Sequence, residues 1–191
     1  MAKIAVVFFS GYGHTTKQAQ AVLEGAAETA GASASLIAIS AEGEIGDADW
    51  AELAAADAII FGSPTYMAGP AWQFKKFADA SSKPWFTHSW KDKIAAGFTN
   101  SASPIGDKPM TIAYLMTLAM QHGMIWIGTG MMPSSQKTAQ RNDINFFGSF
   151  SGLVAQSPAD ATPDEGPFPG DLATARLFGA RVAGYAVKTR G

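Results

Sequence analysis

Short apolar runs alternate along the chain with longer stretches in which apolar residues recur at helical spacing. Five runs are candidate strands, and four of them are continuously apolar, as expected for strands covered on both faces. The predicted strands are Lys3–Phe9, Ser35–Ile39, Ala58–Phe61, Ile94–Phe98 and Met124–Gly128. The predicted helices are Thr15–Ala30, Ala48–Ala56, Ala71–Ala80, Lys108–Gln121 and Leu172–Lys188. Five strand–helix units in alternation predict a parallel sheet with crossover helices.

One segment departs from this alternation. From Thr129 to Gly170 no clear period is visible, and loops this long in compact domains are usually lids, binding surfaces or disordered segments. Its first half contains Phe146 and Phe147, which we expect to be buried. Its second half, 157–170, is rich in Pro and acidic residues, which is typical of an extended surface arm. We therefore predict a single domain, residues 1–191, with a long loop at about 129–170.

Composition narrows the possible functions. A chain of 191 residues with 47% hydrophobic residues can bury one sizeable core. The net charge of −2 supplies no basic field for nucleic acid. Cysteine is absent and the three histidines are scattered, so we predict no metal site and no disulfide. The apolar run 4–9 is too short for a signal peptide or a membrane span. We expect a soluble cytoplasmic protein without nucleic acid or membrane partners.

The candidate chemistry lies where predicted strands end. In open α/β sheets, ligands bind outside the carboxyl ends of the strands, at the point where the strand order reverses. Three of these ends are followed by small and hydroxylated residues, in 10–16, 62–70 and 99–106. Three such loops at one edge could enclose a flat ligand.

The first loop, 10–16, fits a phosphate group. A helix that begins near Thr15 would present unpaired backbone N–H groups and the positive end of its dipole. Gly11 and Gly13 give half of a dinucleotide fingerprint, but Thr16 stands where a third glycine is needed, and no Walker A lysine follows. A polar turn that binds nothing remains the alternative. With an aromatic ring at Tyr66 and polar groups in 99–103, the three loops together predict an FMN site.

Four motifs carry a resemblance over nearly the whole chain: "SGYGHT" at 10–15, "DAIIFGSPTY" at 57–66, "QHGM" at 121–124 and "VAGYAVK" at 182–188. With them the chain resembles the flavodoxin-like NAD(P)H:quinone oxidoreductases, the WrbA-like family that includes the so-called Trp-repressor-binding protein. This resemblance implies a flavodoxin-like α/β fold. It would have a doubly wound, five-stranded parallel sheet of order 2-1-3-4-5, with helices on both faces in three α/β/α layers.

The resemblance also implies the site residues. Those implied for the cofactor are Ser10, Tyr12, Gly13, His14, Thr15, Thr16, Pro64, Thr65, Tyr66, Met67, Gly69, Thr99, Asn100, Ser101, Ala102, Ser103 and His122. Those implied for substrate are Tyr12, Trp85 and His122, with Trp85 supplied by a neighbouring subunit. No side chain is a certain catalytic group, because flavin N5 would carry the hydride. His122, or Tyr66, is a candidate proton or hydrogen-bond donor to the quinone.

Structural alternatives stand beside these assignments. His122 before Gly123 could be a residue that ends a helix, Trp85 could pack the start of a strand, and His14 could be an exposed turn residue. Tyr66 replaces an arginine of the family, and Pro104–Pro109 replaces its glycine-rich run. Both departures fall where nicotinamide and quinone would be recognised.

The implied function is two-electron reduction of quinones by NADH or NADPH through FMN, with ping-pong kinetics, in a homo-oligomer that is a dimer or a tetramer. The main alternative is a flavodoxin-type electron carrier that does not oxidise nicotinamide. The balance of 16 acidic against 14 basic residues argues mildly against such a carrier. A regulatory or scaffolding module and an NAD-binding Rossmann protein are the remaining alternatives.

Overall fold

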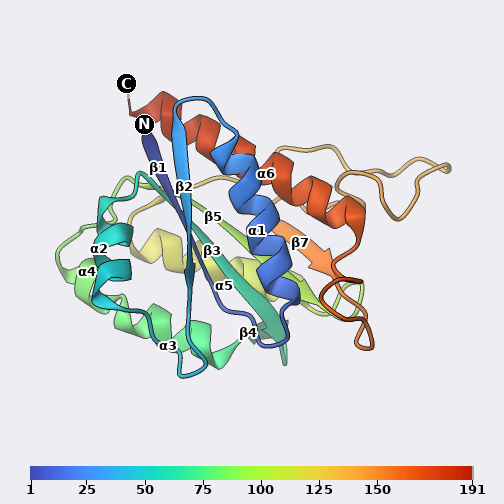
Figure 1. Cartoon of the computed structure of the whole chain (residues 1–191), viewed down its shortest axis with the longest axis horizontal. Coiled ribbons are helices and arrows are strands. Elements are labelled where there is room, and N and C mark those ends of the chain that lie inside the picture. The colour runs from blue at the N-terminus through green and yellow to red at the C-terminus, as the bar shows by residue number, and fades with distance from the viewer. Residues whose placement is uncertain (191) are drawn as a thin grey trace.

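The computed structural model describes residues 1–190, which form a sheet with helices on both faces (Figure 1). The strands are β1 Ala2–Phe8, β2 Ala32–Ala38, β3 Ala58–Tyr66, β4 Gly69–Pro70, β5 Ile94–Ser101, β6 Ile125–Trp126 and β7 Leu153–Gln156. The helices are α1 His14–Ala27, α2 Asp47–Ala55, α3 Trp72–Ala80, α4 Ser82–Phe86, α5 Lys108–Gln121 and α6 Pro169–Thr189. Within residues 1–190, no helix is both long and apolar enough to cross a membrane.

The sheet follows the order β2-β1-β3-β5-β6, and its long strands are parallel. β1 pairs with β2 on one side and with β3 on the other. Strand order therefore reverses at β1, which places the topological switch point at the carboxyl ends of β1 and β3. The chain has the flavodoxin-like α/β fold with a parallel sheet, as expected.

Each face of the sheet has its own core, because successive strand residues point to opposite faces. On one face Ile4, Val6 and Phe8 of β1 pack with buried residues of α1 and α6. On the other face Ala5 and Val7 pack with buried residues of α2, α3 and α5. Figure 1 shows α1 and α6 lying together over the first face. This double burial explains the continuous apolar runs of the strands.

The expectation of five strands is wrong, because the sheet has seven. β4 is a two-residue strand antiparallel to β3. The outer position beside β5 is shared by two pieces: β6 pairs with Ile94 and Ala95, whereas β7 pairs with Phe98–Ser101. Of the predicted strand 124–128, only Ile125 and Trp126 are in the sheet. β7 lies inside the predicted loop 129–170, and its four residues are too short a run to stand out there.

Residues 127–152 form an excursion that leaves the sheet after β6 and returns at β7. Its two ends lie side by side, since the backbone N–H of Thr129 donates to the carbonyl of Phe150 at 2.9 Å. Trp126 Nε1 donates to the carbonyl of Ser151 at 2.6 Å. Gly128 allows this approach, because a Cβ there would lie 2.4 Å from the Phe150 oxygen. The excursion therefore interrupts the outer strand without displacing either piece from β5.

Two strands run further than the sequence predicts. β3 and β5 pair as far as Pro64 opposite Asn100. β3 then extends to Tyr66 by pairing with β4, and β5 extends to Ser101 by pairing with β7. Part of each of the predicted loops 62–70 and 99–106 therefore belongs to a strand. The turn after β3 holds two non-glycine residues at positive φ, Met67 at 46° and Ala68 at 67°, which suits a tight hairpin turn onto β4.

Candidate functional site

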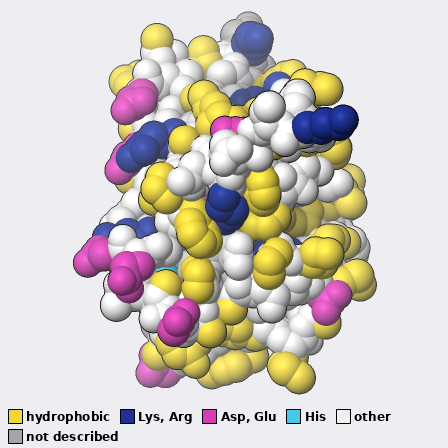
Figure 2. Space-filling view, turned by 90° about the vertical axis from the view of Figure 1, so that its right-hand side faces the viewer, with side chains coloured by type: hydrophobic (Ala, Val, Ile, Leu, Met, Phe, Trp, Pro, Cys, Tyr) yellow, Lys and Arg dark blue, Asp and Glu magenta, His cyan; other side chains and the backbone are white. Residues whose placement is uncertain are grey.

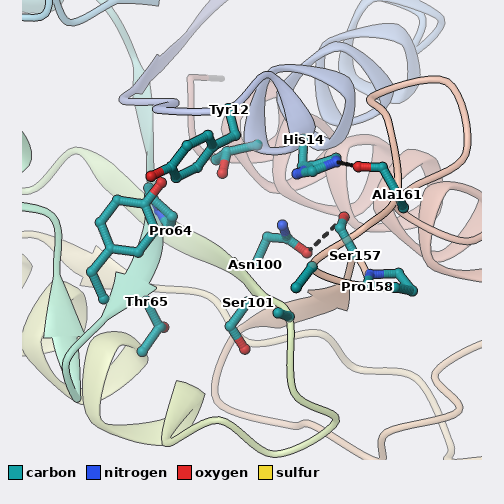
Figure 3. Close-up of a pocket in the computed structure, with 13 residues that line it drawn as sticks. Tyr12, His14, Pro64, Thr65, Asn100, Ser101, Ser157, Pro158 and Ala161 are labelled. Carbon is teal, nitrogen blue, oxygen red and sulfur yellow. Dashed lines mark hydrogen bonds between the residues drawn. The ribbon is translucent and has the colours of Figure 1, made fainter.

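A cavity of about 600 Å³ opens at the carboxyl ends of the central strands (Figure 3). It is lined by Tyr12, His14, Thr15, Pro64, Thr65, Tyr66, Asn100, Ser101, Ala102, Ser157, Pro158, Ala159 and Ala161. The first nine of these were predicted cofactor residues, and they come from three segments far apart in the sequence. The structure thus brings the three predicted loops to a single cavity at the switch point.

The N-terminus of α1 forms one end of the cavity. Gly13 precedes the helix at φ 87°, a conformation that glycine adopts without strain. The Ser10 hydroxyl accepts from the backbone N–H groups of Gly13, at 3.1 Å, and Thr16, at 3.3 Å. His14 and Thr15 line the cavity itself. Because the first N–H groups of a helix lack intrahelical partners, this end can receive an anion such as a phosphate.

Beneath the cavity, hydrogen bonds link the hydroxyl groups of three threonines. Thr65, which lines it, donates to Thr111 Oγ1 at 2.7 Å and contacts Thr99 Oγ1 at 2.8 Å. Thr99 is fully buried, and its carbonyl accepts from Gln18 Nε2 at 3.2 Å. Thr99 therefore does not face the cavity. It links β5 to α1 and to Thr65 of β3, and Thr65 continues the link to α5.

Two tyrosines stand at the mouth. The rings of Tyr12 and Tyr66 meet edge to face with centroids 6.2 Å apart. Tyr66 lies over Gly11, where a Cβ would come within 2.6 Å of its hydroxyl. Burial, followed by the nearby Tyr12, raises the pKa of Tyr66, and the backbone of Gly11 opposes this shift. The Tyr66 phenol is therefore protonated at neutral pH and can donate a hydrogen bond.

A further wall comes from the segment after β7, which sequence reasoning missed. Figure 3 shows Ala161 beside His14 and Ser157 beside Asn100, with Pro158 next to Ser157. The Ser157 hydroxyl donates to Asn100 Oδ1 at 3.3 Å, and His14 Nε2 donates to the Ala161 carbonyl at 2.9 Å. The unrecognised strand β7 was the missing signal, because its carboxyl end places these residues beside β5.

Other predicted cofactor residues lie around the cavity without lining it. Ser10, Gly13 and Thr16 shape the turn into α1. Met67 is fully exposed, and Gly69 belongs to β4. The Ser103 carbonyl accepts from Lys108 Nζ at 2.7 Å.

His122 and Trp85 do not line the cavity within this chain. His122 follows the last residue of α5, whereas Lys108 and the 101–106 loop lie at the other end of that helix. His122 is 4% exposed and packs against Trp90 with the two rings tilted and their centroids 4.3 Å apart. Its Nε2 contacts Ser81 Oγ at 2.9 Å. Trp85 Nε1 donates to the carbonyl of Gln121 at 3.0 Å.

The Nδ1 side of the His122 ring lies in an apolar environment. Its Nδ1 is buried without a hydrogen-bond partner in the described chain. Burial lowers the pKa of His122 to about 4, so the ring is neutral at physiological pH. In the single chain it is a structural residue that packs between Ser81 and Trp90.

The part of the chain that the structure describes holds no group of three or more acidic, histidine or cysteine side chains able to bind a metal. On the side of the molecule seen in Figure 2, basic and acidic side chains are scattered among apolar ones.

Comparison with known proteins assigns the family. The family model described as NADPH-dependent FMN reductase matches residues 4–139. The chain belongs to that family. Membership identifies FMN as the cofactor and NADPH-dependent reduction as the chemistry of the family.

Individual relatives agree with this assignment. "Flavodoxin FldP" of Pseudomonas aeruginosa is 50% identical over 183 residues, covering 96% of both chains. An "NAD(P)H dehydrogenase (quinone)" of Geobacter sulfurreducens is 34% identical over 208 residues, covering 98% of this chain and 99% of the relative. The crystal structure of a flavodoxin, WrbA-like protein from Agrobacterium tumefaciens superposes with a TM-score of 0.78 at 48% identity, covering 98% and 99% of the two chains.

The residues of the cavity fit FMN. Its volume of about 600 Å³ lies within the range of small-molecule sites. The N-terminus of α1 suits the phosphate, and no lysine or arginine lines the cavity. Strand ends and two tyrosines at the mouth suit a planar ring.

Proposed function

We propose that this protein binds FMN in the cavity and reduces quinones by two electrons with NADH or NADPH as donor. The observation that carries the proposal is a cavity with the N-terminus of a helix at one side and an accessible aromatic mouth at the other. Tyr12 is 76% exposed at that mouth. Bound FMN supplies the hydride chemistry, and the protein positions the reactants.

The chain's own residues have three tasks in this function. The Ser10 turn and the N-terminus of α1 hold the phosphate by backbone N–H groups. The ends of β3 and β5 offer Thr65, Asn100 and Ser101 as polar partners. Tyr12 and Tyr66 cover the mouth and limit the access of water to a bound ring.

Tyr66 is the candidate hydrogen-bond donor to the quinone oxygen, since its raised pKa keeps the phenol protonated. Tyr66→Phe should lower kcat/KM for quinone about tenfold, because the ring is kept and one donor is lost. The FMN affinity should change little. An equal loss of FMN affinity and quinone turnover would contradict this role.

The second candidate is a flavodoxin-type electron carrier that does not oxidise nicotinamide. It is favoured by the relative named flavodoxin at 50% identity, whereas the relatives named NAD(P)H dehydrogenase (quinone) are more distant, at 31–34%. The two candidates share cofactor and fold, so they differ only in whether nicotinamide reduces the bound flavin.

Anaerobic mixing of FMN-loaded protein with NADH or NADPH separates them. Full bleaching of the flavin absorbance, reversed by added benzoquinone, is the result expected for the reductase. A flavin that stays oxidised with both nucleotides, yet is reduced by dithionite one electron at a time, would show the carrier instead. Protein that does not bind FMN would contradict both candidate functions.

Assembly bears on the substrate side of the site. Within one chain Trp85 and His122 lie away from the cavity, so a role for them in substrate binding requires a second copy. We propose a homo-oligomer, a dimer or a tetramer, and light scattering of the FMN-loaded protein tests it. A monomer at all concentrations would exclude both residues from the site. A cytoplasmic location also stays a prediction.

A further inference from the structure

Lys108 is a cation in an unusual place. It is 1% exposed, although lysine is seldom fully buried. It is also the first residue of α5, where the helix dipole disfavours positive charge. Helix stability therefore does not account for its position.

Neutral groups surround the ammonium. Lys108 Nζ donates to Ser101 Oγ at 3.0 Å and to the Ser103 carbonyl at 2.7 Å, and it lies 5.1 Å from the centroid of the Phe147 ring. Across residues 1–190, no carboxylate lies within 4 Å of it. Asp171 is the acidic group whose charge acts on it, and Arg141 forms an ion pair with that carboxylate at 2.7 Å.

The free chain therefore leaves a buried positive charge without a counter-charge. Burial lowers the pKa of Lys108 to about 8, the charge of Asp171 opposes this, and Arg141 adds to it. The group is mostly protonated at neutral pH. Buried charges are screened by solvent much less than exposed ones, so this charge acts on neighbouring ligands.

The charge lies directly behind the cavity wall. Ser101, which accepts from Lys108, lines the cavity together with Ala102. Ser101 ends β5 and Ala102 follows it. Figure 3 shows Ser101 across the cavity from His14, the first residue of α1, whose N-terminus would take the phosphate. A flavin bound with its phosphate at α1 would therefore have its ring toward this charge.

We propose that Lys108 is an electrostatic positioning residue, which acts through Ser101 to favour the reduced over the oxidised form of the bound cofactor. The proposal rests on FMN as cofactor. Hydride transfer from NAD(P)H moves two electrons and one proton to the isoalloxazine and releases NAD(P)⁺, so the ring gains one negative charge. A fixed cation behind the wall lowers the free energy of that more negative form.

Lys108→Met tests this, because it removes the charge and keeps most of the apolar stem. The affinity ratio of reduced to oxidised FMN should fall at least tenfold, which equals about 30 mV in the midpoint potential of a two-electron couple. The control is Lys93→Met. Lys93 is also a partly buried lysine held by carbonyl oxygens, those of Ala54 and Ala56, but it precedes β5 at the end of the sheet away from the cavity. Its replacement should leave the potential unchanged.

The outcomes are distinguishable. Failure of the wild-type apoprotein to bind FMN, followed by flavin fluorescence, would refute the proposed function rather than the role of Lys108. FMN binding with the same midpoint potential in wild type and Lys108→Met would overturn the role of Lys108 alone. An equal shift in Lys93→Met would also overturn it, because the effect would then be one of net charge.

The wild type provides a test that needs no variant, in case Lys108→Met does not fold. If the reduced ring raises the pKa of Lys108 above its starting value of about 8, reduction takes up one additional proton above pH 8. The midpoint potential should then fall more steeply there, by about 30 mV more per pH unit. A single slope from pH 7 to 10 would overturn the proposal.

Discussion

The buried histidine at the end of α5 makes stability depend on pH in a calculable way. In the folded chain burial lowers the pKa of His122 from 6.5 to about 4. The unfolded chain therefore binds a proton below pH 6.5 that the folded chain does not bind until about pH 4. The contribution of neutral, buried His122 to the free energy of unfolding is therefore fully present above pH 6.5 and is lost as the pH falls to about 4. A shift of 2.5 units corresponds to about 3 kcal/mol.

His122→Gln removes this titration and retains a group that can bond Ser81. We expect urea unfolding of the apoprotein to show a loss of about 3 kcal/mol more in wild type than in His122→Gln between pH 7.5 and 4. Apoprotein is required, because bound cofactor would add its own stabilisation. His14 and His88 are present in both proteins, so their contributions to the pH dependence cancel in the difference between the two unfolding free energies. Identical pH dependence of the two free energies would refute the reasoning, and would show that the ring is protonated or solvated in the folded state.

Three further predictions concern packing and the site. Gly179→Ala on α6 should cost at least ~2 kcal/mol of unfolding free energy, because its Cβ would lie 2.0 Å from the Val22 oxygen of α1. Gly184→Ala on the same helix meets nothing within 4 Å and should gain up to ~1 kcal/mol; the same sign for both would contradict this packing. Arg141→Ala should cost about 3 kcal/mol in urea unfolding, since it leaves the 4% exposed carboxylate of Asp171 unpaired, and a loss below ~1 kcal/mol would refute that. Ser10→Ala should weaken FMN binding roughly fivefold in fluorescence titration by loosening the turn into α1, whereas unchanged affinity would remove Ser10 from the site.

Local pattern was sufficient for most of the architecture. The helix Lys108–Gln121 was predicted with the bounds that the structure has. The buried strands were recognised because double burial leaves a continuous apolar run. Their ends were misjudged at Tyr66 and Ser101, since these polar strand ends pair with β4 and β7, two short strands that carry no clear local signal.

The lining of the cavity was also predicted in part, because local strand signals place nine of its residues. Nine of the lining residues follow or end strands that the sequence reveals, and parallel strands bring their carboxyl ends to one edge of the sheet. The wall at Ser157–Ala161 was missed because β7 is short and joins β5 only after an excursion of the chain.

The sequence by itself determined the fold class, the switch point and the family, because these depend on periodicity and on motifs that are contiguous in the chain. Only the tertiary structure decided that His122 and Trp85 lie away from the cavity and that Lys108 lies behind its wall. His122 was a candidate by its motif, but it lies at the other end of α5 from Lys108, which no motif singled out. Distance and burial arise from packing between elements, and residue types in order along a chain do not specify them.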